Sequence, residues 1–385
     1  MPIDAAPQSG SMTPRLSAVP DQMAVGATIR LVREWRGLMV KDLAERVGVT
    51  SSYVSKAELG QTQVTGRALE DFAAALSVRP GLLTREIPTQ LSEGIHFRSQ
   101  SRVTQRARKR AIANMNLVGH VLGQMVATLG DADFPRVLPE YDVDRLEGGA
   151  VEAAQLVRRQ WRLDGPIVDM AGVLEAVGVI VLPLPADLIG IDALTVRVDT
   201  DGIVAVLGIR DDVPEDRKRH TLAHELGHLV MDQQSPQPSA KAVEERADMF
   251  AGEFLAPYDE IGPELEGITP AQVDVLHALR ARWGVSLPAL VRRAYLGGAI
   301  NETQYRYWFR VLNARNLMRG QQGSSYPLCP HLAQHVITEM RALGYSMTDI
   351  VDITDFDVRD LQSTLGSSWP YPQIGRPLSI VPDQS

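Results

Sequence analysis

Residues 217–231 read RKRHTLAHELGHLVM, and residues 242–257 read AVEERADMFAGEFLAP. In the first segment, Leu222, Leu226 and Val230 recur every four residues, which predicts an amphipathic helix with one packed side. The second segment has a similar apolar stripe and predicts a second helix. Two packed helices are therefore expected in the middle of the chain, and the polar residues that border their stripes decide its chemistry.

Three polar residues of the first segment form the pattern H-E-x-x-H. His224 and His228 are one helical turn apart, so they project from one face, and two imidazoles at this spacing can share one zinc ion. Glu225 lies too far round the helix to ligate the same ion easily, but it can reach a metal-bound water. Two histidines and a glutamate on one helix are also compatible with ordinary surface groups, so the flanking residues decide between these interpretations.

The second segment supplies the missing part of such a site. A catalytic zinc ion needs a third protein ligand and an open fourth position for water. Glu244 borders the apolar stripe of the second helix, so it can face the first helix, and Asp248, one turn later, can accept the second N–H of a ligating histidine. The predicted Zn²⁺ site consists of three ligands, a catalytic base and a supporting acid: His224, His228 and Glu244, then Glu225, then Asp248.

Short segments rich in Val, Ile and Leu precede the first of these helices and predict strands. The expected strands are Val177–Leu184, Ile191–Val198 and Ile203–Ile209, and the amphipathic segments before them, expected as helices, are Val151–Trp161 and Ile167–Ala176. The sequence DTDG at 199–202 is suited to a hairpin turn between the last two strands. The sequence thus predicts an α+β core around the two helices.

The two quoted segments resemble the ImmA/IrrE family of metallopeptidases, and the likeness extends over about residues 151–260, including GPIVDMAGVLEAVGVIV and IDALT. The resemblance implies a zincin-like α+β domain with a His-His-Glu zinc site of the gluzincin kind, completed by Glu244. It also implies endopeptidase activity, in which Glu225 takes a proton from water and passes it to the leaving amine. An extended substrate is expected to pair with a strand edge, that of Ile203–Ile209. The family usually has an aromatic residue at His220, which we interpret as a packing residue that approaches the substrate.

The first third of the chain has a helical pattern that Gly, Ser and Thr interrupt at short intervals. One helix is expected to end near Gly37 and a second at Gly48, and Thr50 is suited to cap a third helix, SSYVSKAEL. Two short helices joined by a tight turn that contains glycine form the helix-turn-helix geometry.

The line VGATIRLVREWRGLMVKDLAERVGVTSSYVSKAELGQ resembles the Cro-like (XRE-type) helix-turn-helix family. The resemblance implies that a twofold homodimer reads a double-stranded DNA operator with the third helix in the major groove. It places Ser51, Ser52, Tyr53 and Lys56 at base edges, with Ser55 and Lys41 nearer the phosphates. Many members have a glutamine where this chain has Val40, and a role in dimerisation or protein docking remains the alternative.

The net charge of −8 conceals an asymmetry along the chain. Residues 1–112 carry 16 Lys and Arg against 10 Asp and Glu, a net charge of +6, so the remaining 273 residues carry −14. Much of the excess comes from one basic cluster: Arg98, Arg102, Arg106, Arg108, Lys109 and Arg110. A basic N-terminal region suggests contact with a polyanion, although such a run of charges is also typical of a solvated helix face or linker.

Composition also excludes several classes of protein. Residues 1–22 are rich in Pro, Ser, Ala and Gln without a continuous apolar run, so we expect a disordered tail and no secretory signal. The longest apolar stretch, Ala176–Ala186, is much shorter than the roughly 20 residues of a membrane helix. Cys329, the one cysteine, excludes an internal disulfide framework. A cytoplasmic protein without a membrane partner is expected.

Helical periodicity dominates from Thr269 onward. The expected helices are Val273–Trp283, Leu287–Leu296, Glu302–Leu312, Leu332–Leu343 and Met347–Ile353. The stretch SLPALVRRAYLGGAINETQYRYW resembles the helical extension of longer family members, and we expect its aromatic residues to form core rather than a docking surface. Cys329, His331 and His335 lie close together in sequence, but we assign no metal or haem site to them.

The expected fold is mainly α with an α+β core. The expected division of the chain is a disordered tail at 1–22, a Cro-like helix-turn-helix domain at 23–90, a basic helical linker at 91–149, a zincin-like metallopeptidase domain at 150–262 and a helical C-terminal region at 263–385. The leading hypothesis is a cytoplasmic DNA-binding transcriptional regulator whose zinc-dependent endopeptidase domain cleaves a partner repressor or antitoxin-like protein. The alternatives are a repressor whose metallopeptidase fold only senses a metal or peptide, and an antitoxin that uses this fold to bind a protein.

Overall fold

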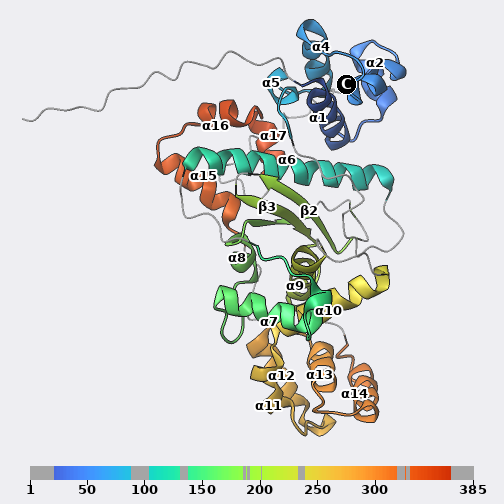
Figure 1. The fold of residues 1–385 in the computed structure, drawn as a ribbon, viewed down its shortest axis with the longest axis vertical. Coiled ribbons are helices and arrows are strands. Elements are labelled where there is room, and N and C mark those ends of the chain that lie inside the picture. Colours follow the sequence, from blue (N-terminus) through green and yellow to red (C-terminus); the bar gives the residue numbers. More distant parts are fainter. Residues whose placement is uncertain are drawn as a thin grey trace, which may run out of the picture.

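A mixed sheet of three strands lies at the centre of the computed structural model (Figure 1). β1 (Val179–Pro183) runs parallel to β3 (Ile203–Ile209), and β2 (Ala193–Thr200) forms the expected antiparallel hairpin with β3. The order is β1-β3-β2, so the expectation that Ile203–Ile209 offers a free edge is wrong. The backbone of β3 pairs on both sides, so β1 and β2 are the edge strands of this sheet.

The structure describes residues 21–87, 104–130, 138–184, 188, 191–200, 202–232, 239–318, 326 and 330–365. Nearly all of the expected disordered tail lies outside these ranges, as do Arg98, Arg102 and Cys329. Within them the fold is mainly α with an α+β core, as predicted. No helix in the described ranges is both long enough and apolar enough to cross a membrane.

Helices cover both faces of the sheet (Figure 1). α6 (Gln105–Leu129) crosses one face, and α9 (Glu215–Met231) and α10 (Ala240–Leu255) lie on the other. Successive strand residues point to opposite faces, so Ile180 enters the core on the α6 side and Val179 enters the core on the α9 side. The sheet therefore separates two hydrophobic cores.

α6 is longer than the segment Ala111–Leu129 that its periodicity predicts. It begins at Gln105 because the hydroxyl of Thr104 accepts a hydrogen bond from the backbone N–H of Ala107, which caps the helix. The helix comes close to β2 at Gly119, where an added Cβ would lie 2.8 Å from the methyl carbons of Val198. α6 thus packs closely against one face of the sheet.

The N-terminal helices begin and end close to the residues that the sequence indicated. They are α1 (Gln22–Trp35), α2 (Val40–Val47), α3 (Ser51–Glu58), α4 (Gly66–Leu76) and α5 (Pro80–Leu83). Gly48 ends α2 with a φ of +78°, a conformation that costs a glycine little, and the hydroxyl of Thr50 accepts a hydrogen bond from the backbone N–H of Tyr53. The predicted helix-turn-helix is therefore present.

The helices around the sheet agree with the sequence pattern in position, although their ends differ. α7 (Gly149–Trp161) begins two residues earlier than expected, and α8 (Met170–Glu175) occupies only part of Ile167–Ala176. α10 packs against both α7 and α9, and Trp161 of α7 meets Phe254 of α10 edge to face, with ring centroids 6.1 Å apart. The aromatic contact fixes α10 between its two neighbours.

The C-terminal third divides between the two sides of the sheet (Figure 1). The helices that join the core below the sheet are α11 (Tyr258–Leu265), α12 (Val273–Trp283), α13 (Leu287–Leu296) and α14 (Glu302–Ala314). The helices that pack against α6 on the other side are α15 (Leu332–Ala342), α16 (Met347–Thr354) and α17 (Val358–Leu365). α11 and α17 were not predicted.

Ion pairs join the helix-turn-helix to α16 and α17. Arg36, at the end of α1, donates to both carboxylate oxygens of Asp360 at 2.8 and 2.7 Å. Two further pairs connect the following helices to the same region: Arg79 with Asp352 at 2.9 Å and Arg85 with Asp355 at 2.6 Å. The chain thus returns from its C-terminal third to hold its basic N-terminal domain with acidic side chains.

Candidate metal centre and nucleic-acid interface

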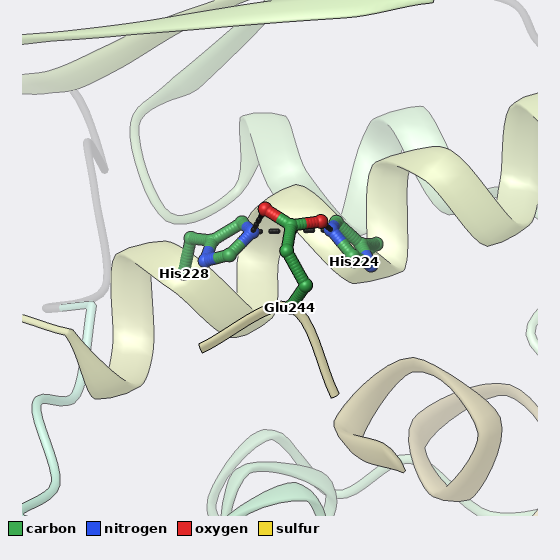
Figure 2. Close-up of side chains that lie close together, drawn as sticks. All are labelled: His224, His228 and Glu244. Carbon is green, nitrogen blue, oxygen red and sulfur yellow. Dashed lines mark hydrogen bonds and ion pairs between the residues drawn. The ribbon is translucent and has the colours of Figure 1, made fainter. Parts of the chain in front are cut away.

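Two histidines of α9 point into one space (Figure 2). His224 and His228 are 1% and 2% exposed, and their Nε2 atoms lie 3.1 Å apart. Their direction follows from the packing of the helix, because Leu222, Leu226 and Val230 are fully buried and fix its rotation against the core.

Glu244 brings a carboxylate into the same space (Figure 2). Its Oε2 lies 3.3 Å from Nε2 of His224, and its Oε1 lies 3.7 Å from Nε2 of His228. α10 can approach α9 this closely because Phe250 lies over Gly227, where an added Cβ would come within 3.1 Å of the ring. The side chain of Glu244 is 42% exposed, so the cluster is open to solvent on the side of the glutamate.

The three side chains fit a zinc ion. One ligand atom from each lies within 4.8 Å of the others. A tetrahedral zinc ion with bonds of about 2.1 Å holds neighbouring ligand atoms roughly 3.4 Å apart, close to the 3.1 Å between the two Nε2 atoms and to the 3.3 and 3.7 Å from them to the two oxygens of Glu244. Two imidazoles and one carboxylate also leave a fourth position for water, which is the ligand arrangement of a catalytic zinc site.

A carboxylate stands behind each histidine. Nδ1 of His224 lies 2.9 Å from Oδ1 of Asp248, and Nδ1 of His228 lies 2.6 Å from Oδ2 of Asp232. A carboxylate only accepts, so each Nδ1 donates its proton and each Nε2 keeps its lone pair for the shared space. Asp248 lies where the sequence placed it. Asp232 was missed, although its spacing of four residues from His228 on α9 is a signal that helical periodicity provides.

Glu225 follows His224 on α9 and is 1% exposed. Its Oε2 accepts a hydrogen bond of 2.7 Å from the hydroxyl of Thr195, on the edge strand β2. Burial raises the pKa of Glu225, although the nearby His228 and the hydrogen bond from Thr195 oppose the shift. Thr195 had no signal in the sequence, because its contact depends on how β2 is placed against α9.

The residues predicted to contact DNA lie mostly on an exposed surface. Ser51, Ser52, Ser55 and Lys56 on α3 are exposed, as is Lys41 on α2. Tyr53 differs, since it is half-buried and its ring stacks on Phe72 with the centroids 6.4 Å apart. The structure therefore gives Tyr53 a packing contact within the domain in addition to its position on α3.

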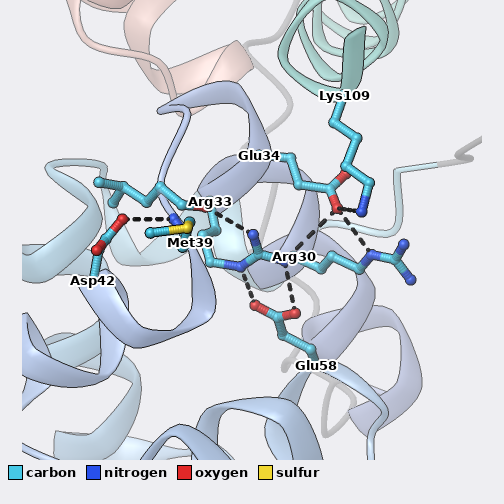
Figure 3. Close-up of polar contacts among 8 residues, drawn as sticks. Arg30, Arg33, Glu34, Met39, Asp42, Glu58 and Lys109 are labelled. Carbon is cyan, nitrogen blue, oxygen red and sulfur yellow. Dashed lines mark hydrogen bonds and ion pairs between the residues drawn. The ribbon is translucent and has the colours of Figure 1, made fainter. Parts of the chain in front are cut away.

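A buried arginine fixes α3 against α1 (Figure 3). Arg33 donates from Nε and Nη2 to the two carboxylate oxygens of Glu58 at 2.5 and 2.9 Å, and from Nη1 to the carbonyl of Leu38 at 2.8 Å. On the same helix, Glu34 lies 3.2 Å from Arg30 and 3.8 Å from Lys109 of α6. A two-pronged pair of this kind sets direction as well as distance, so the orientation of α3 is defined by these contacts.

Comparison with known families agrees with this geometry. A model described as the IrrE N-terminal-like domain, of peptidase family M78, matches residues 174–295, and a model described as a helix-turn-helix domain matches residues 24–86. No curated protein matches the chain. The first match runs from the end of α8 through α13 and includes the His-His-Glu cluster. The chain therefore carries an N-terminal helix-turn-helix domain and, behind it, an IrrE N-terminal-like domain with a metallopeptidase-like fold, which is the fusion that its sequence predicts.

Proposed function

We propose that this chain is a cytoplasmic, DNA-binding transcriptional regulator whose zinc-dependent endopeptidase site cleaves a partner repressor or antitoxin-like protein. The observation that carries the proposal is the convergence of His224, His228 and Glu244 beside Glu225, on a fold of the metallopeptidase kind. The ligands alone support a metal-binding protein. The buried Glu225 next to them supports a catalyst.

Each residue of the cluster has a chemical role in this proposal. His224, His228 and Glu244 hold Zn²⁺, and Asp248 and Asp232 keep the two imidazoles in the correct tautomer. A bound zinc ion supplies Lewis acidity, which polarises a peptide carbonyl and lowers the pKa of water. Glu225 accepts a proton from the attacking water and later delivers it to the leaving amine. The hydroxyl of Thr195 holds one carboxylate oxygen of Glu225 and leaves the other for the proton.

The edge strand β2 suits an extended substrate. β2 pairs with β3 on one side, and its Thr195 contacts Glu225, so the strand lies beside the proposed reaction centre. A peptide that adds to a sheet edge gains main-chain hydrogen bonds without reference to its side chains. We therefore place the substrate backbone along β2.

The helix-turn-helix domain supplies the regulatory half of the proposal. Its α3 presents exposed polar side chains, and Arg33 with Glu58 fixes the direction of that helix. Domains of this type read paired half-sites, so the proposal includes a homodimer on a double-stranded operator. The ranges 23–90 and 150–262 are the parts of the chain that we assign to the two activities.

Metal content tests the site directly. Mass spectrometry of the purified full chain should find about one zinc per chain, and His228→Ala and Glu244→Ala should each lose it. Glu225→Gln should keep the zinc and lose hydrolysis, and it then serves as a trap for the uncleaved partner. A Glu225→Gln chain that still cleaves would remove Glu225 from the role of base.

The same experiment separates the alternative, a repressor or antitoxin whose fold only senses a metal or binds a protein. In that case Glu225→Gln would leave both zinc binding and regulation of the target gene intact, because a sensor needs only the three ligands. Absence of zinc after purification and after reconstitution would leave a DNA-binding regulator without a peptidase.

A further inference from the structure

A cavity of about 480 Å³ lies between α9, α10, α13 and α14. In Figure 1 these helices lie together below the sheet. The volume falls in the range of sites that hold a small molecule or a group of side chains, about 300–1,000 Å³. Its wall includes His220, Asp248, Gly252, Leu296, Tyr305 and Phe309.

The cavity lies beside the metal cluster. His220 lies one turn before His224 on α9, and their ring centroids are 6.4 Å apart. Asp248 belongs to both places, since it accepts from Nδ1 of His224 and also lines the cavity. On α10, Gly252 continues the same face by one more turn. Two residues of the wall, His220 and Asp248, therefore contact His224 and connect the cavity to the cluster.

The wall of the cavity carries apolar side chains that are unusually exposed. Leu296 is 51% exposed, Met249 is 38% exposed and Met318 is 37% exposed. Beside them, the rings of Tyr305 and Phe309 lie with their centroids 4.7 Å apart. Apolar surface that is left in contact with water and gathered in one concave place is typical of a binding site.

Three charged groups in the same wall are engaged elsewhere, whereas Arg292 is exposed. Arg293 pairs with the buried Glu253, and Asp216 lies 3.5 Å from Arg280. Asp248, as described above, holds His224. A ligand in this cavity therefore meets mainly apolar and aromatic surface, which favours an apolar side chain.

We propose that this cavity binds a large apolar side chain of the peptide substrate, aromatic or long aliphatic, at a position close to the scissile bond. The inference rests on the proposed peptidase function, because the neighbouring cluster is what identifies the ligand as a peptide. Gly252 and Leu296 determine the specificity: Gly252 leaves the space open, since an added Cβ meets only the Cδ of Arg293 at 3.6 Å, and Leu296 provides the exposed side of the wall.

The test uses the full chain in its Glu225→Gln form, loaded with zinc, and five-residue peptides with blocked ends, Ala at four positions and Phe, Leu, Ala or Asp in the middle. Binding is followed by NMR titration up to millimolar peptide. The Phe and Leu peptides should bind at least about tenfold more tightly than the Ala and Asp peptides, since each buries more apolar area. Gly252→Leu fills the cavity and should abolish the difference, and Leu296→Ala should reduce it.

Leu343→Ala is the matched control, because Leu343 is 65% exposed at the end of α15, outside the cavity, and the preference should survive there. Equal binding of all four peptides to a zinc-loaded chain would reject the cavity as a binding site for a side chain, without contradicting the proposed peptidase function. A preference for Phe and Leu in a chain that takes up no zinc would support the cavity and reject the peptidase. Loss of the preference in Leu343→Ala as well as in Gly252→Leu would also overturn the assignment.

Discussion

Asp232 accepts a hydrogen bond of 2.6 Å from Nδ1 of His228, on the side of the ring opposite the metal cluster. The pair spans one turn at the end of α9, where the backbone N–H of Asp232 also donates to the carbonyl of His228. The acid that ends the helix therefore orients the second histidine as well, just as Asp248 of α10 orients the first.

Replacement of Asp232 should weaken zinc binding. Asp232→Asn keeps the shape of the side chain but removes its charge, and loss of such an outer contact typically lowers metal affinity by about 10- to 100-fold. Competition with a calibrated chelator measures the change. Asp274→Asn, at an exposed position in the first turn of α12, is the control and should leave the affinity unchanged. Equal affinities of the two variants would remove Asp232 from the site.

Thr195→Val should reduce turnover without loss of metal. The substitution removes the hydrogen bond that holds one oxygen of Glu225, and a misplaced base loses part of the roughly 10²- to 10⁴-fold that proton transfer contributes. We expect kcat to fall by about tenfold with zinc content and KM unchanged, once a cleavable partner is in hand. Thr195→Ser keeps the hydroxyl and should restore most of the rate. A rise in KM or a fall in zinc content would show that Thr195 serves the substrate or the fold instead.

Helical periodicity explains why the sequence could foresee the cluster. His224 and His228 must share a face if their segment is a helix, and Glu244 must face that helix if its own stripe is buried; both conditions hold in the structure. Asp232 was predictable on the same ground. These residues lie on two helices that are adjacent in sequence, so local pattern was sufficient.

Contacts that depend on distant pairing were not predictable. Strand order does not follow chain order, and β3, third in sequence, takes the centre of the sheet, which made the expected edge wrong. Thr195 reaches Glu225 only because β2 is an edge strand placed against α9. In the same way, Arg36 meets Asp360 across most of the chain, and no periodicity connects two segments so far apart.

Glu175 should make stability depend on pH. It is buried in α8, its carboxylate accepts from the backbone N–H groups of His331 and Leu332 at the start of α15, and burial raises its pKa to about 7 despite these hydrogen bonds. An acid whose pKa is raised in the folded state contributes most below its ordinary pKa of 4.5, and that contribution is lost as the pH rises towards 7. At most about 3 kcal/mol of unfolding free energy is involved.

Glu175→Gln should flatten this dependence between pH 4.5 and 7, because the neutral amide can still accept from both N–H groups through one oxygen. Urea unfolding of the metal-free chain at several pH values measures it, as the difference between variant and parent. Glu339→Gln, at an exposed position of α15, should leave the slope as it is. A parallel pair of curves for Glu175→Gln and the parent would rule out a titrating Glu175.

The pair of Arg36 and Asp360 should contribute more than the pair of Arg79 and Asp352. The side chains of the first pair are 24% and 9% exposed, and both carboxylate oxygens are used, whereas those of the second are 41% and 60% exposed. A double-mutant cycle with alanine at each position should give a coupling of about 1–3 kcal/mol for the first pair and below about 0.5 kcal/mol for the second. Equal couplings would mean that Asp360 does not hold the helix-turn-helix more firmly than a surface acid does.

Substitutions on α3 should separate DNA reading from packing. Ser52→Ala and Lys56→Ala remove exposed polar groups and should weaken binding to operator duplexes selected from random sequences, each by roughly 10- to 100-fold, without a change in thermal stability. Arg67→Ala, which removes an exposed cation from α4, is the control and should change binding little.

Tyr53→Ala should lower the melting temperature because its ring stacks on Phe72, whereas Tyr53→Phe keeps the stack and should melt like the parent. If Tyr53→Phe loses operator binding at full stability, the hydroxyl of Tyr53 contacts DNA. If Ser52→Ala and Lys56→Ala bind the operator like the parent, α3 is not the helix that reads DNA, and the domain binds a protein instead.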